Sequence, residues 1–148
     1  MAQPDLLGIV VRDMATALKF YRLLGLDIPS NMDAEPHVEY VLPGGFRLAW
    51  DSLEMVKGID PNWVEPTGQR MTLAFKCENA EEVDTLYNRV IENGYGGHTL
   101  APHGLSAQSL TVRCQGGASA GEEPWDAFWG QRYAVVVDPV GNSVDLFA

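Results

Sequence analysis

The sequence has few basic residues, and this limits the partners it can bind. It contains 10 Lys and Arg against 20 Asp and Glu, which gives a formal net charge of −10. Nucleic-acid binding depends on neutralising phosphates with basic side chains, so we expect no nucleic-acid partner. The negative charge favours a cationic small molecule or a basic protein surface; the alternative is that it serves solubility alone.

Cysteines and long apolar runs are also scarce. Cys77 and Cys114 are far apart in the sequence and have no metal-type spacing, so we expect them to be reduced thiols. No apolar run is long enough for a membrane span, and residues 1–12 lack the basic start and apolar core of a signal peptide. These absences predict a cytoplasmic protein that does not bind a membrane.

The first half of the chain shows the pattern of a strand, a helix and a hairpin. Residues 5–12 are rich in β-branched residues, and Asp13 is a natural N-cap for the helical spacing of residues 14–24. Residues 37–42 and 46–50 are predicted strands, joined by a Pro-Gly-Gly turn.

The second half repeats this order. Residues 71–76 are a predicted strand, Asn79 is the predicted cap of a second helix, and residues 97–101 are a brief strand. An aromatic-rich loop then leads into a closing hairpin over residues 131–147, which turns at an Asp-Pro-Val-Gly-Asn motif. Asp13 and Asn79 lie 66 residues apart, and Tyr21 and Tyr87 share the same offset.

This internal repeat predicts an α+β fold. We expect two tandem βαβββ-type modules whose curled mixed sheets surround a cleft. The first module covers about residues 1–57 and the second about residues 70–148, with a linker at about residues 58–69 and an insertion at about residues 104–123.

Several motifs carry a resemblance to a known family. They are Val11-Arg12-Asp13-Met14, Phe20-Tyr21, Leu24-Gly25-Leu26, Leu73-Ala74-Phe75, Trp129-Gly130-Gln131-Arg132-Tyr133, Asp138-Pro139-Val140-Gly141-Asn142 and Val144-Asp145-Leu146-Phe147. With them the sequence resembles the vicinal oxygen chelate superfamily, which includes glyoxalases, extradiol dioxygenases and bleomycin-resistance proteins. The resemblance covers nearly the whole chain except residues 104–123.

Enzymes of this superfamily hold a divalent ion with His and Glu from four strand positions. The resemblance carries those positions onto Leu6, Ala49, Thr72 and Asp145. Three of the four are not ligands of the required kind, so we predict no metal site and no cofactor. Asp145 is expected to pair with a neighbour such as Arg132 or Arg47, and a metal-free role in proton transfer is the alternative.

The histidines do not replace the missing ligands. His37 lies at the start of a predicted strand, and His98 and His103 lie around a loop. The three have no paired spacing, and we expect them to be exposed or hydrogen-bonded rather than metal ligands.

Aromatic residues outside the regular core pattern predict a ligand site instead. The candidate residues are Tyr40, Trp50, Trp63, Trp125 and Phe128, with Asp51 and Asp126 supplying negative potential. Trp129 is expected to be structural, because it leads directly into a strand.

The resemblance is closest in character to metal-free bleomycin-resistance-like binding proteins, which are homodimers. It implies that this protein sequesters a planar or cationic drug or natural product, as in antibiotic resistance. The alternatives are a metal-dependent or cofactor-free lyase, isomerase or dioxygenase, and a structural or regulatory dimer without a ligand.

Overall fold

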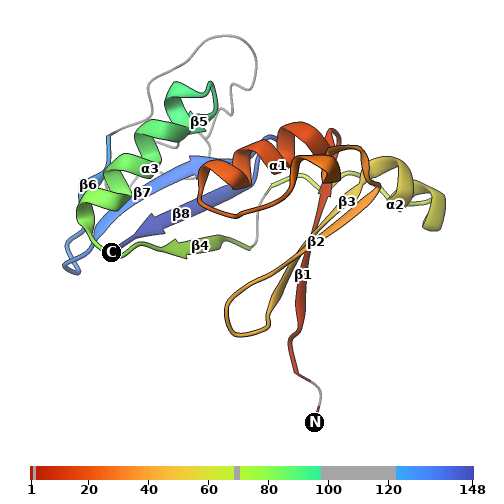
Figure 1. Cartoon of the computed structure of the whole chain (residues 1–148), viewed down its shortest axis with the longest axis horizontal. Helices are drawn as coiled ribbons and strands as arrows, with labels where there is room; N and C mark the ends of the chain where they lie inside the picture. The colour runs from red at the N-terminus through yellow and green to blue at the C-terminus, as the bar shows by residue number, and fades with distance from the viewer. Residues whose placement is uncertain (2, 69–70, 98–122) are drawn as a thin grey trace. The chain divides into compact units, whose positions relative to one another are not determined.

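The computed structural model describes residues 1, 3–68, 71–97 and 123–148 (Figure 1). These residues divide into two compact units, Met1–Thr67 and Gly68–Ala148. Each unit contains its own mixed sheet, and the division falls inside the predicted linker. The fold is therefore mixed α+β, as the sequence predicted.

The first unit contains a three-stranded sheet in the order β1-β3-β2. Strand β1 runs parallel to β3, and β2 is antiparallel to β3. Its elements are β1 (Leu6–Val11), α1 (Met14–Leu23), the 3₁₀ helix η1 (Ser30–Ala34), β2 (His37–Val41), β3 (Arg47–Ser52) and α2 (Leu53–Ile59).

Helix α1 begins where the sequence predicted, because the Asp13 side chain accepts a hydrogen bond from the Thr16 amide at 2.7 Å. The helix ends at Leu23, and Gly25 follows with a φ of 99°, a conformation that favours glycine. Helix α1 buries Ala17, Leu18, Phe20 and Tyr21. This apolar stripe packs on one face of the first sheet, where it meets the fully buried Trp50.

Helix α2 was not predicted. Ser52 caps it by accepting a hydrogen bond from the Met55 amide at 3.2 Å, and the helix reaches Ile59, past the expected start of the linker. Seven residues are too few to show a helical period in the sequence.

The second unit contains a sheet in the order β4-β8-β7-β5, with β6 also paired to β7. Its elements are β4 (Leu73–Lys76), α3 (Ala80–Glu92), β5 (Gly96–Gly97), β6 (Trp125–Asp126), β7 (Arg132–Val137) and β8 (Ser143–Phe147). Helix α3 begins at the predicted cap, Asn79, and buries Val83, Leu86, Tyr87 and Val90. The short strand β6 was expected to be loop.

The turn between β7 and β8 is held by one buried carboxylate. Asp138 accepts hydrogen bonds from the Val140 and Asn142 amides at 3.0 and 2.8 Å, and from Asn142 Nδ2 at 2.9 Å. Gly141 has a φ of 93°, which other residues adopt with strain. The Asp-Pro-Val-Gly-Asn motif therefore forms the turn that the sequence indicated.

Both units pair their strands in the same way. In each, the first strand runs parallel to the last, and the last is antiparallel to the strand before it. The first sheet has three strands rather than the four of a βαβββ module, so the tandem arrangement stays a prediction. The enclosed cleft also stays a prediction.

Two expectations fall largely outside the described residues. These are most of the strand expected at residues 97–101 and nearly all of the insertion at residues 104–123. Within the part that is described, no helix combines the length and apolar character needed to cross a bilayer.

Candidate functional site

Strand alternation divides the second sheet into two chemically different faces. Ala134, Val136, Val144 and Leu146 are buried, and α3 packs on the two strands that carry them. Tyr133, Asp145 and Phe147 alternate with these residues and therefore point to the face opposite α3.

Five aromatic side chains gather on this face, and we call them the aromatic row: Trp125, Phe128, Trp129, Tyr133 and Phe147. Strand pairing sets Tyr133 between Trp125 and Phe147, with ring centroids 5.3 and 6.4 Å away. Trp129 meets Tyr133 at 5.6 Å, and Phe128 meets Trp129 at 4.8 Å.

The outer end of the aromatic row is accessible. Phe128 is 81% exposed and Trp129 is 50% exposed. Trp129 was expected to be structural. Its indole N–H donates to Gln131 Oε1 at 2.8 Å, which fixes the ring while leaving half of it exposed. Such a ring can take part in ligand contact.

A carboxylate lies on the same face, because the Tyr133 hydroxyl donates a hydrogen bond to Asp145. Burial and the adjacent Asp145 carboxylate raise the pKa of the Tyr133 hydroxyl, so it remains a neutral donor. Asp145 is paired with a neighbour, as expected, but within its own unit the partner is Tyr133 and not Arg132. Arg132 binds Asp84 and Asp126 instead, and Arg47 binds Asp5 and Glu39.

Asp126 alternates with Trp125 on β6 and pairs across strands with Arg132, which binds Asp84 of α3, so Asp126 points to the α3 face rather than to the aromatic row. Its carboxylate is 86% exposed and contacts Arg132 Nη1 at 3.3 Å. Asp145 is therefore the better placed source of negative potential for a ligand on this face.

The remaining predicted aromatic residues, Tyr40, Trp50 and Trp63, belong to the first unit. Trp50 is 0% exposed and contacts Tyr21 of α1, so its proposed role as a ligand wall was wrong. Tyr40 pairs across strands with Leu48 on the same side as Trp50 and is half-buried. Trp63 is half-buried after α2, and its amide donates to the Asp60 carbonyl at 3.0 Å.

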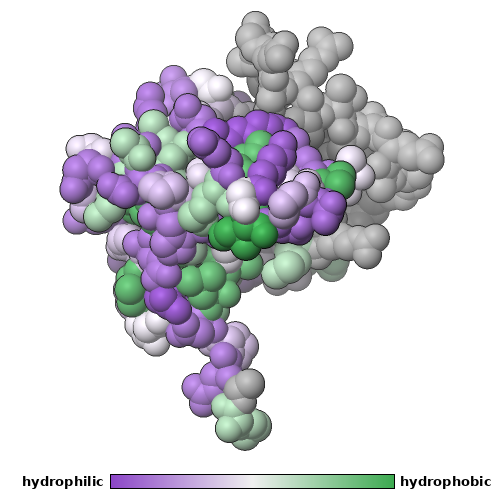
Figure 2. All heavy atoms as spheres, turned by 90° about the vertical axis from the view of Figure 1, so that its right-hand side faces the viewer, coloured by the Kyte–Doolittle hydropathy of each residue, from purple (hydrophilic) through white to green (hydrophobic). Residues whose placement is uncertain are grey.

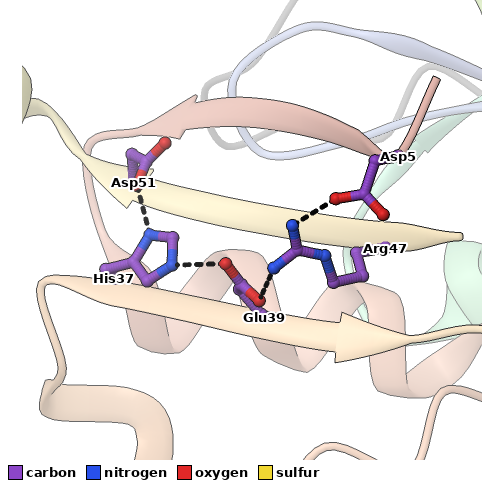
Figure 3. Close-up of polar contacts among 5 residues, drawn as sticks. All are labelled: Asp5, His37, Glu39, Arg47 and Asp51. Atoms are coloured by element: carbon purple, nitrogen blue, oxygen red, sulfur yellow. Dashed lines mark hydrogen bonds and ion pairs between the residues drawn. The ribbon is translucent and has the colours of Figure 1, made fainter. Parts of the chain in front are cut away.

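Asp51 belongs to a charged network on the face of the first sheet opposite α1 (Figure 3). We call this network the polar ladder; its members are Asp51, His37, Glu39, Arg47 and Asp5. His37 Nδ1 lies 2.6 Å from Asp51 Oδ1, and His37 Nε2 lies 3.1 Å from Glu39 Oε1. Arg47 donates to Glu39 at 2.6 Å and also to Asp5.

The polar ladder changes the acidity of its members. The hydrogen bonds to Asp51 and Glu39 raise the pKa of His37, and the bonds from His37 and Arg47 lower the pKa of Glu39. Sequence reasoning did not predict this network. The signal was that His37 and Glu39, and likewise Arg47 and Asp51, are an even number of residues apart, so each pair shares one face of a strand. His37 begins β2, where the sequence predicted the start of a strand, and its ring is hydrogen-bonded as expected.

The first unit also exposes large apolar side chains, and Figure 2 shows apolar patches within a mainly hydrophilic surface. The large apolar residues that are exposed in the described part of this unit are Met1, Leu6, Val41, Phe46, Ile59 and Val64. Single exposed apolar residues are normal on soluble proteins. They do not by themselves define a site.

The residues at the superfamily's metal positions do not fit a metal ion. Leu6 and Ala49 have no donor atom, Thr72 is an exposed residue before β4, and Asp145 is bonded to Tyr133. Glu39 and Asp51 contact opposite nitrogens of the His37 ring, so these three groups do not converge on one point. Among the described residues, no cluster of three His, Cys, Asp or Glu side chains could hold an ion. His98 and His103 lie outside them.

The strand pairing of the two mixed sheets is consistent with a fold of the glyoxalase type, and comparison with known proteins supports this class. The model of the Glyoxalase/Bleomycin resistance protein/Dioxygenase superfamily matches residues 3–146, so the chain belongs to this superfamily. A comparison with curated proteins finds no match.

Solved structures share the fold at low identity. A glyoxalase/bleomycin resistance protein/dioxygenase family enzyme from Burkholderia phytofirmans PsJN has a TM-score of 0.70 and 17% identity, covering 99% of this chain and 98% of that one. A glyoxalase-related enzyme from Fulvimarina pelagi has a TM-score of 0.68 and 18% identity, covering 99% and 88%. Oxidase ChaP-H2 has a TM-score of 0.59 and 18% identity, covering 99% and 93%. These similarities show the fold alone.

Proposed function

We propose that this protein binds and sequesters a planar, cationic small molecule, such as a drug or natural product, on the aromatic row. The observation that supports this most directly is the pair of exposed rings, Phe128 and Trp129, that continues into Tyr133 beside the Asp145 carboxylate. Binding of this kind needs no metal ion.

The physical case rests on stacking and charge. Each aromatic contact with a planar or cationic ring contributes on the order of 1 kcal/mol, and more where water is excluded. A micromolar dissociation constant corresponds to about 8 kcal/mol, so several rings must act together with burial of apolar area. The aromatic row offers adjacent rings at 4.8 to 6.4 Å, and Asp145 adds a favourable charge for a cation.

The alternative is a lyase, isomerase or dioxygenase, whether metal-dependent or cofactor-free. A metal-dependent reaction lacks a ligand of the required kind at three of the four expected positions, Leu6, Ala49 and Thr72. The cofactor-free alternative assigns proton transfer to Asp145, whose carboxylate already accepts the Tyr133 hydrogen bond. Sequestration requires neither a set of metal ligands nor a free catalytic base, so it agrees better with the residues that are present.

Calorimetric titration tests the proposal with the planar cation proflavine and its neutral relative acridone. Phe128→Ala and Trp129→Ala should each weaken proflavine binding about ten-fold, which corresponds to 1.4 kcal/mol. The matched control is Phe46→Ala, which removes a partly exposed ring of the first unit and should leave the affinity unchanged. Equal affinity of all three variants and the native protein would contradict the proposal.

We further propose that the protein is a homodimer, as the resemblance implies. Native mass spectrometry of the purified protein measures the dimer, any bound metal ion and any co-purified small molecule in one experiment. A monomer at micromolar concentration would contradict this part of the proposal without affecting the ligand site.

A further inference from the structure

Glu39 joins two cationic groups of the polar ladder with a single carboxylate (Figure 3). Its Oε1 atom lies 3.1 Å from His37 Nε2, and its Oε2 atom accepts a hydrogen bond from Arg47 Nη1 at 2.6 Å. Each oxygen thus has its own donor, which is how a protein binds the carboxylate of a ligand.

Both donors are held in place by other acids. Asp51 holds the far nitrogen of the His37 ring at 2.6 Å, and Asp5 holds the second terminal nitrogen of Arg47. A neutral imidazole has only one N–H, so a ring that contacts carboxylates at both nitrogens is the imidazolium. The raised pKa of His37 agrees with this. His37 and Arg47 therefore direct their remaining donors to one position.

The surroundings of that position suit a small organic molecule. Glu39 pairs across strands with Ala49, and Ala49 pairs with Gly8, so this row carries little side-chain bulk. An atom placed where Gly8 would carry Cβ meets only Asp51 Oδ2 at 3.6 Å and a Leu6 methyl at 3.8 Å, which are ordinary contact distances.

Apolar side chains lie next to this row. Leu6 and Val41 both pair across strands with Arg47, so they lie on its face, and both are exposed. They could contact the apolar part of a bound acid.

We propose that His37 and Arg47 form a binding site for the carboxylate of a small aliphatic acid, and that Glu39 is an internal occupant which this acid displaces. The exchange replaces one carboxylate by another, so His37 and Arg47 each keep an anionic partner. The site lies in the first unit and does not depend on the aromatic row.

Glu39 can leave without a change of the backbone. It lies on β2, an edge strand, and its side chain is 33% exposed, so a rotation of the side chain takes the carboxylate into water. An attached carboxylate competes at an effective concentration in the millimolar range or higher. The native protein should therefore bind a free carboxylate weakly, and neutralising Glu39 should strengthen binding.

Imidazole ¹⁵N NMR at pH 6 tests this, with propionate as the probe and neutral propionamide as its control. In Glu39→Gln the His37 Nε2 resonance should shift saturably with propionate, at about one tenth of the half-saturating concentration of the native protein. Propionamide should have no effect, and adding Arg47→Met should abolish the shift. Glu92→Gln, a charge removal on α3, should behave like the native protein.

Two results would overturn the proposal: no saturable shift in Glu39→Gln, or an equal shift with propionamide. If Glu39→Gln does not fold, the Glu39 carboxylate ¹³C resonance of the native protein replaces it as the readout. Displacement by molar propionate should move this resonance towards that of a solvated carboxylate. No movement beyond the effect of equimolar sodium chloride would overturn the proposal.

Discussion

The indole of Trp50 packs against the ring of Tyr21, with centroids 5.0 Å apart and ring planes inclined at 57°. The two residues connect β3 to α1, and both are almost completely shielded from solvent. Trp50 is therefore part of the core of the first unit. Its indole Nε1 is buried and has no hydrogen-bond partner among the described residues.

Trp50→Ala should destabilise the protein by about 3–5 kcal/mol, because it removes a large buried ring and leaves a cavity. Trp50→Phe should cost clearly less, since it keeps an aromatic ring and removes the polar Nε1 that lacks a partner. Urea unfolding followed by circular dichroism measures both changes. Equal losses of unfolding free energy for the two variants would show that the size of the cavity does not determine the destabilisation.

His37 should make stability depend on pH. Its pKa is raised above the ordinary value of 6.5 by Asp51 and Glu39, so the protonated ring is favoured by folding. This stabilisation is complete below pH 6.5 and is lost as the pH rises through the folded-state pKa. In His37→Gln the unfolding free energy should fall less between pH 6 and 9 than in the native protein. An identical pH dependence of the unfolding free energy in both proteins would contradict the role given to His37 in the polar ladder.

Asp138→Ala should destabilise the β7–β8 turn by about 1–3 kcal/mol, because it leaves part-buried amide donors without their carboxylate acceptor. Thermal unfolding measures the loss. Asp126→Ala is the matched control: its carboxylate is highly exposed, and surface substitutions of this kind change stability by at most about 0.5 kcal/mol. A similar effect of the two substitutions would mean that Asp138 does not hold the turn.

Asp145→Asn should separate charge from stacking in the proposed ligand site. The change keeps the size of the side chain and an acceptor for the Tyr133 hydroxyl. Proflavine binding should weaken several-fold, because the cation loses an opposite charge, whereas acridone binding should change little. Calorimetry measures the affinity for both compounds. An equal loss of affinity for proflavine and acridone would assign Asp145 a structural role.

Much of the fold followed from the sequence alone because its signals are local. Asp13 and Asn79 cap helices through amides three residues further on, and the Asp138 turn closes within five residues. Alternation of apolar residues likewise marked the strands before any partner strand was known. Helix α2 and the pairing of β6 with β7 lacked such signals, since both are short.

The candidate sites depend on contacts that no local pattern contains. Residue types alone indicated that aromatic rings and acids were available, and they ruled out the superfamily's set of metal ligands. Only the tertiary structure decided that Trp50 faces α1, that Asp145 meets Tyr133, and that His37 and Arg47 share one carboxylate. Each of these results depends on strand register, because a shift of one residue would turn every side chain of a strand to the other face.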